Sequence, residues 1–108
     1  MNTNKTTSYK NLYSQEFQLK LTANPKAVLL DVRTPGEFLG GRIPYAINLN
    51  VMDRDFIQKI SSLDKNKTYF VYCRSGGRSA QACSIMEKQG LEVYNLAGGI
   101  SHWAGEIC

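Results

Sequence analysis

The chain has 108 residues, of which 43% are hydrophobic and 20% are charged, the balance of a soluble globular protein. Lysine and arginine outnumber aspartate and glutamate by 13 to 9, but the lysines are scattered along the chain, so we expect no nucleic-acid partner. No apolar run approaches the length of a membrane span, so we expect a cytoplasmic protein with no membrane partner. Nothing in the pattern indicates an obligate interface, and we expect a monomer.

The cysteines argue against a metal site. There are three, Cys73, Cys83 and Cys108, and with one histidine in the chain they form neither a CxxC pair nor a cluster of ligands. We therefore expect no metal and no other cofactor. The odd number of cysteines is typical of a reducing compartment, where disulfides are rare.

The N-terminal part predicts one strand and one helix. Residues 1–8 are polar, and we expect a flexible segment there, followed by a single domain over residues 9–108. Residues 9–13 read as a short edge strand, and Ser14 as the N-cap of a helix that runs to about Ala23. Phe17 and Leu21 share one face of that helix.

A capping box follows the next predicted strand, which covers residues 28–33. Thr34 is in place to cap a short helix, with Pro35 at its first position and Glu37 reaching back to the cap. Gly40 and Gly41 end this helix.

Residues 46–49 predict a further strand, and Asp53 is the expected N-cap of the helix after it. That helix has apolar residues at the spacing of a buried face, namely Phe56, Ile57, Ile60 and Leu63.

The most informative stretch runs from Tyr69 to Ser79. Tyr69–Tyr72 is uniformly apolar, as in a strand that is buried on both faces of a parallel sheet, and Cys73 ends it. Ligands of open α/β sheets bind at the carboxyl ends of strands. Gly76 and Gly77 allow a loop whose amides point inward, and Ser79 opens a helix whose positive end faces the same point.

Two interpretations of Cys73 are open at this stage. Cysteine is often a buried structural residue. A glycine loop flanked by two arginines and a helix start instead favours a reactive thiol with a lowered pKa, and we prefer that interpretation.

The rest of the chain completes an alternating pattern. Residues 79–89 predict a helix that turns Ala82, Cys83 and Met86 inward and ends at a left-handed Gly90. Residues 93–96 predict a strand, and residues 97–99 a turn into a last helical segment, where Trp103 closes the core. Strands alternating with helices indicate an α/β fold with a mainly parallel sheet.

Four motifs in this order resemble those of single-domain rhodanese-like sulfurtransferases. They are Asp31-Val-Arg33 with Glu37-Phe38, Gly41-Arg-Ile-Pro44 with Ala46-Ile-Asn48, the loop Cys73–Arg78, and Leu96-Ala-Gly-Gly99 with Trp103. The resemblance implies a three-layer α/β fold, a small mainly parallel sheet flanked by helices. The family often has His at the position of Arg42 and Gly at that of Tyr45, so the shape and charge of the site's rim differ here.

The resemblance also implies a chemistry. Cys73 would take a sulfane sulfur from a small anionic donor such as thiosulfate, become a persulfide, and pass the sulfur to a thiol, cyanide or protein acceptor by ping-pong kinetics. Residues of the loop would bind the substrate: Arg74, Ser75, Gly76, Gly77, Arg78 and Ser79. Their amides would surround the outer sulfur, and the two arginines would attract the donor.

Other candidate residues have simpler interpretations. Asp31 and Arg33 could line the site, but we favour a structural ion pair. His102 is expected on the surface, Cys83 in the core, and Cys108 exposed as a weak candidate for a second thiol. Capping already explains Glu37.

Two alternative functions are open. A non-catalytic rhodanese-like binding module is one, although such modules often lack the cysteine. A Cys-based phosphatase or arsenate enzyme is the other, but those loops have five residues between Cys and Arg, whereas four stand here, residues 74–77.

Overall fold

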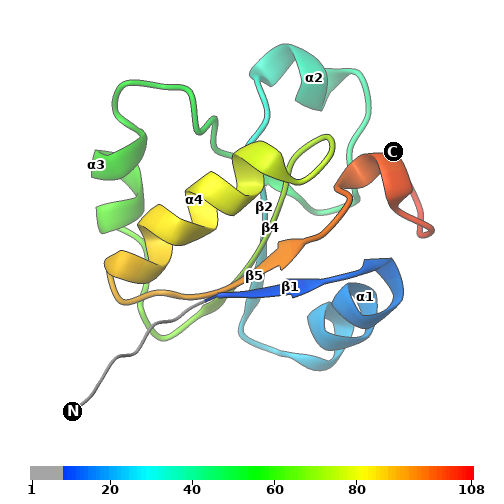
Figure 1. Cartoon of the computed structure of the whole chain (residues 1–108), viewed down its shortest axis with the longest axis horizontal. Helices are drawn as coiled ribbons and strands as arrows, with labels where there is room; N and C mark the ends of the chain where they lie inside the picture. Colours follow the sequence, from blue (N-terminus) through cyan, green and yellow to red (C-terminus); the bar gives the residue numbers. More distant parts are fainter. Residues whose placement is uncertain (1–8) are drawn as a thin grey trace.

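The structure, a computed structural model, describes residues 9–108, so the segment expected at residues 1–8 lies outside the described residues. The elements in chain order are β1 Lys10–Leu12, α1 Ser14–Ala23, β2 Ala27–Asp31, α2 Pro35–Leu39, β3 Ile47–Asn48, α3 Phe56–Ser61, β4 Thr68–Tyr72, α4 Gly77–Lys88, β5 Glu92–Leu96 and a 3-10 helix, Ile100–His102. Five strands of the described part form one sheet in the order β1-β5-β4-β2-β3 (Figure 1). Every pairing is parallel, which confirms the predicted sheet.

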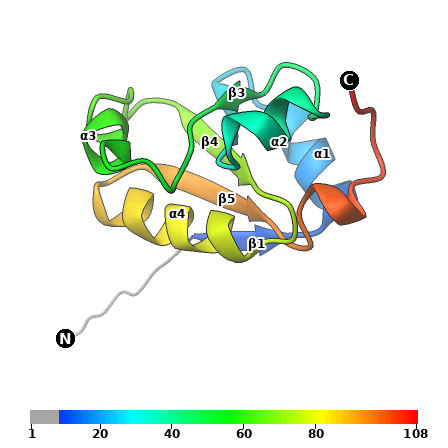
Figure 2. The same ribbon diagram turned by 90° about the horizontal axis from the view of Figure 1, so that it is seen from above.

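Helices cover both faces of the sheet and give the predicted three layers (Figure 2). α3 and α4 pack on one face, and α1 packs on the other together with Trp103. The order of the strands places β4 at the centre, between β5 and β2. The carboxyl end of β4 is therefore enclosed by the segments that follow its neighbours.

The burial of β4 explains its uniform sequence. All five residues are buried, because the strand has a helix layer on each side. Tyr69 and Val71 belong to the core cluster on the α3 and α4 face, whereas Phe70 and Tyr72 belong to the cluster on the α1 face. The Phe70 ring meets that of Phe17 edge to face at 5.4 Å. Each large side chain buried this way contributes roughly 1.5–3 kcal/mol to stability.

Local signals predicted most helix ends, and the capping box is confirmed in full. The Thr34 hydroxyl oxygen accepts a hydrogen bond from the Glu37 amide, and the Glu37 carboxylate accepts one from the Thr34 amide. Gly90, with φ of 87°, follows the end of α4 in the predicted left-handed conformation.

Two predicted caps are wrong. Tyr13 is the N-cap of α1, and Ser14 is its first residue, whose hydroxyl oxygen accepts the Ala104 amide at 2.9 Å. The helix α3 begins at Phe56 after Asp55, so the Asp53 side chain does not cap it. Ile57, the second residue of α3, was expected on the buried face but is 55% exposed. The helix α3 has fewer than two turns, and only Phe56 and Ile60 face the sheet.

The helix α4 begins two residues earlier than predicted. Gly76 is its N-cap with φ of 111°, a left-handed conformation that glycine adopts without strain. The chain therefore enters the helix at Gly77, and Ser79 lies inside the first turn.

Within residues 9–108, no helix is both long enough and apolar enough to cross a membrane. The same residues contain no group of three His, Cys, Asp or Glu side chains that could hold a metal ion.

Candidate functional site

Cys73 lies directly after β4, at the carboxyl edge of the sheet, as the sequence predicted. It is only 1% exposed and belongs to the core cluster under α4. Its position is set by the central strand behind it and by the start of α4 in front of it. The thiol is thus both buried and close to a helix N-terminus.

Hydrogen-bond donors surround the sulfur. The Gly76 amide donates to Cys73 Sγ at 3.1 Å, and the Ser79 amide donates at 3.3 Å. The Ser79 hydroxyl lies 3.3 Å from Sγ and 3.2 Å from the Gly76 carbonyl oxygen. A hydroxyl has one hydrogen to donate, so it can serve the sulfur or the carbonyl, and a thiolate is the stronger acceptor.

These donors decide the ionisation of Cys73. Burial disfavours the charged form, but the Ser79 hydroxyl and three loop amides outweigh it and hold the pKa of Cys73 below its ordinary value. The amides are those of Ser79, Gly76 and Ser75. The arrangement can therefore hold a sulfur atom that carries negative charge.

The loop rests on the segment that the sequence predicted as a turn followed by a last helical segment. The Ile100 amide donates to the Cys73 carbonyl oxygen at 2.9 Å, and the Ser101 amide donates to that of Arg74 at 3.0 Å. Between them and the loop lies Gly99, where an added Cβ would stand 2.4 Å from the Arg74 carbonyl carbon. Only glycine fits this contact. The paired glycines after β5 were the signal in the sequence, but their partner could not be read from it.

Arg78, which the resemblance implies would help to attract the donor, forms an ion pair in the structure. Its Nη1 and Nη2 atoms donate to Glu37 Oε1 and Oε2 at 2.8 and 2.9 Å, a bidentate ion pair. The pKa of Glu37 falls to about 2, chiefly through these bonds, with burial opposing and bonds from Thr34 assisting. Sequence reasoning assigned Glu37 to capping alone and missed this pair, because the partners are 41 residues apart.

The other loop residues proposed to bind the substrate differ in exposure. Arg74, Ser75 and Gly77 are exposed at the rim, and Gly76 is half-buried. Within residues 9–108, the Arg74 guanidinium has no carboxylate partner. It is therefore the loop's uncompensated cation.

The favoured interpretation of Asp31 and Arg33 is confirmed. Arg33 Nη2 lies 2.7 Å from Asp31 Oδ2, both side chains are buried, and Nη2 also donates to the Gly41 carbonyl oxygen. This ion pair holds the segment after α2 against the end of β2. Cys83 is fully buried in the core, and His102 and Cys108 are exposed, also as predicted.

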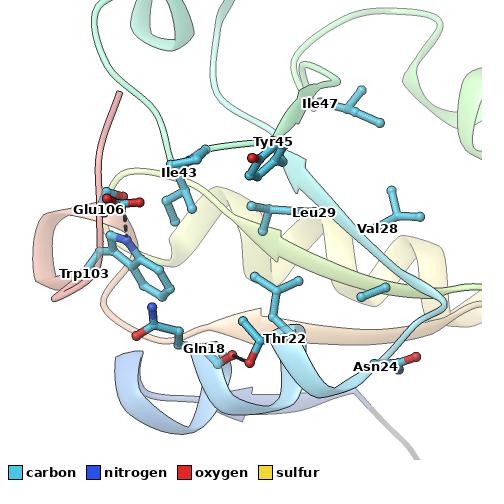
Figure 3. A pocket seen from close by; sticks show the side chains of 13 residues that line it. Gln18, Thr22, Asn24, Val28, Leu29, Ile43, Tyr45, Ile47, Trp103 and Glu106 are labelled. Carbon is cyan, nitrogen blue, oxygen red and sulfur yellow. Dashed lines mark hydrogen bonds between the residues drawn. The ribbon is translucent and has the colours of Figure 1, made fainter.

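A cavity of about 470 Å³ is separate from the Cys73 loop. It opens on the α1 face, where α1 and β2 line it and Trp103 and Glu106 close one end (Figure 3). No residue from 73 to 79 reaches it, and among the described residues that line it there is no cysteine, histidine, lysine or arginine. We therefore place the candidate site at Cys73.

Comparisons with known proteins agree with this fold. The rhodanese-like domain family matches residues 14–106. The chain is 35% identical over 97 residues to "Putative sulfurtransferase YtwF" of Bacillus subtilis, covering 90% of this chain and 92% of that protein. It is 38% identical over 92 residues to a sulfurtransferase of Allochromatium vinosum, covering 84% of each. Its fold is similar to that of a rhodanese-related protein from Thermoplasma volcanium, with a TM-score of 0.81 and 27% identity over 93% of this chain and 98% of the other.

Proposed function

The chain belongs to the rhodanese-like domain family, and from that premise we propose that it is a sulfurtransferase with Cys73 as its sulfur carrier. The observation that carries the proposal is the set of donors around Cys73 Sγ, from Gly76 and Ser79. They favour the thiolate, which is the nucleophilic form. Residues 9–108 act as one domain in this proposal.

The first half-reaction loads the sulfur. The Cys73 thiolate attacks the outer sulfur of a sulfane donor, a new S–S bond forms, and the donor's own S–S bond breaks with its electron pair leaving on the remainder. With thiosulfate, the leaving group is sulfite, and Cys73 becomes a persulfide with one negative charge. The loop amides that stabilise the thiolate also suit this outer sulfur, since both are large anions.

The second half-reaction returns the thiolate. An acceptor nucleophile, either a thiolate or cyanide, attacks the outer sulfur and leaves with it as a persulfide or thiocyanate. No net oxidation occurs over the cycle. Arg74 lies exposed at the rim, in place to attract anionic donors.

Intact-mass spectrometry tests the proposal. After exposure to a sulfane donor, we expect the protein to gain the mass of one sulfur atom, and to lose it on addition of cyanide or a thiol. Cys73→Ser is the blank. A wild-type protein that gains no sulfur from any donor, or that gains it equally in the blank, would contradict the proposal. Turnover of an aryl phosphate that depends on Cys73 would instead indicate a phosphatase.

A further inference from the structure

The ion pair between Glu37 and Arg78 is fixed before any substrate binds. Glu37 Oε1 accepts from Arg78 at 2.8 Å and from the amide and hydroxyl of Thr34, each at 3.1 Å. The capping box therefore anchors the carboxylate to α2, and the bidentate contact fixes the guanidinium. These bonds hold the pair in one geometry, so little side-chain entropy remains to be lost when a substrate binds.

This pair stands next to the candidate nucleophile. Arg78 lies in the first turn of α4 and directly precedes Ser79, whose amide and hydroxyl both contact Cys73 Sγ. The hydrogen bond that Arg78 donates to Glu37 is the main interaction that raises the pKa of Arg78. Desolvation opposes it, and the charges of Glu37 and Cys73 add to it. The first turn of α4 thus carries Arg78 and also supplies the Ser79 groups that contact the sulfur.

The carboxylate of Glu37 cancels that charge at the rim. Of the two arginines in the loop, Arg74 is the one without a carboxylate partner among the described residues. Within residues 9–108, Arg42 on the segment after α2 also lacks a carboxylate partner, and its guanidinium lies over the Phe38 ring at 4.7 Å from the centroid. The site therefore offers a donor about one positive charge from its loop rather than two.

The charge of the donor should then matter. Loading from thiosulfate brings a dianion to a thiolate, whereas an organic thiosulfonate or an alkyl persulfide brings one negative charge. Like charges repel strongly at short range where water is partly excluded. One loop cation balances the single charge of a monoanionic donor, but it leaves one negative charge of a dianionic donor uncompensated.

We propose that Glu37 sets the donor class of this site: by neutralising Arg78, it favours monoanionic sulfane-sulfur donors over dianionic thiosulfate. The inference rests on the proposed sulfurtransferase function and narrows it. Glu37 acts through Arg78 and does not touch the sulfur, so it is a positioning and selectivity residue rather than a catalytic one.

The test compares two donors in charge variants. Thiosulfate and benzenethiosulfonate both deliver their outer sulfur to a thiolate, with sulfite and benzenesulfinate as the respective leaving groups. Loading of Cys73 is followed by mass under single-turnover conditions at low ionic strength, where screening is weakest. The readout is the ratio of the second-order rate constant for loading from thiosulfate to that for loading from benzenethiosulfonate.

Three variants change the charge in opposite directions. Glu37→Gln keeps the size of the side chain and frees the charge of Arg78, so the ratio should rise roughly tenfold. Arg78→Gln leaves the carboxylate unpaired and should lower the ratio roughly tenfold. The double variant restores neutrality, and its ratio should return to that of the wild type. Glu16→Gln, an exposed residue in the first turn of α1 on the other face of the sheet, is the matched control and should leave the ratio unchanged.

A role in shape alone predicts different results. If Glu37 only holds the loop, Glu37→Gln would slow both donors equally, the ratio would stay constant, and the inference would be overturned. A double variant whose ratio does not return would overturn it as well. A wild type that takes sulfur from neither donor would instead overturn the sulfurtransferase function on which the inference rests.

Discussion

Cys73 and Cys83 are two buried thiols of the same core cluster, and they differ in ionisation. Their exposed fractions are 1% and 0%, and both lie between α4 and the sheet. Burial raises the pKa of Cys83 far above its ordinary value, and the nearby charge of Cys73 adds to the shift. The pKa of Cys73 is lowered, although burial opposes its ionisation too.

Hydrogen-bond donors account for the difference. Cys83 is inside α4, where the backbone amides already bond to helix carbonyls and none is free for the sulfur. Cys73 precedes the helix and meets amides of the loop and first turn, which have no such partners. The ionisation of a buried thiol thus depends on its place relative to a helix start rather than on its exposure.

The largest expected effect separates the two thiols directly. Cys73→Ala should reduce sulfur transfer to background, because it removes the proposed carrier. Cys83→Ala should keep its turnover and lose about 1–3 kcal/mol in the free energy of unfolding, since it leaves a small cavity. Sulfur loading by mass and urea unfolding measure the two quantities. A folded but inactive Cys83→Ala protein would show that the second thiol takes part.

Displacing the loop should make Cys73 resemble Cys83. Gly99→Ala would place a Cβ 2.4 Å from the Arg74 carbonyl carbon, in a backbone conformation, with φ of 63° and ψ of −166°, that non-glycine residues rarely adopt. We expect a loss of at least about 1–3 kcal/mol in stability and a fall of more than tenfold in sulfur loading. Gly36→Ala is the control, because a Cβ there meets nothing within 4 Å. Normal loading by Gly99→Ala would mean that the loop holds its shape unaided.

Removing one hydrogen-bond donor from Cys73 should also bring its pKa closer to that of Cys83. Ser79→Ala deletes the hydroxyl bond to Cys73, so the pKa of the thiol should rise, and alkylation at neutral pH should slow roughly tenfold. Alkylation rate against pH measures this: in the wild type, the inflection should lie below the ~8.5 of a free thiol. Ser84→Ala, in the middle of α4, is the control. An inflection that does not move in Ser79→Ala would remove the hydroxyl from the explanation.

The smallest expected effect extends the comparison to a carboxylate. Glu37 is also held ionised by hydrogen bonds, with its pKa lowered from 4.5 to about 2. A lowered pKa stabilises the folded state above pH 4.5, and this contribution is lost as the pH falls toward 2. Both partners are nearly one-third exposed, so we expect about 1 kcal/mol or less. Urea unfolding between pH 4.5 and 2 should show the loss of this contribution to the free energy of unfolding in the wild type and not in Glu37→Gln. Equal losses of stability with falling pH in the two proteins would contradict this prediction.

The sequence alone determined the features that depend on near neighbours. A uniformly apolar strand, a cysteine at its end and two glycines before a helix are local choices of backbone and burial, and they predicted both the parallel α/β fold and the place of Cys73. The capping box spans only four residues and was predicted in full. Such features can be predicted from the sequence because their physical causes act within one turn or one strand.

Only the tertiary structure decided which distant groups meet. Glu37 reaches Arg78 because the central β4 pairs with β2, which brings the helices that follow these two strands together at one edge of the sheet. Gly99 fits under Arg74 because β5 pairs with the other side of β4. Ser14 binds the Ala104 amide instead of capping its own helix, because the C-terminal segment returns to α1. Side-chain polarity does not encode these pairings, since several carboxylates, glycines and serines in the chain fit each partner equally well until the strand order is set.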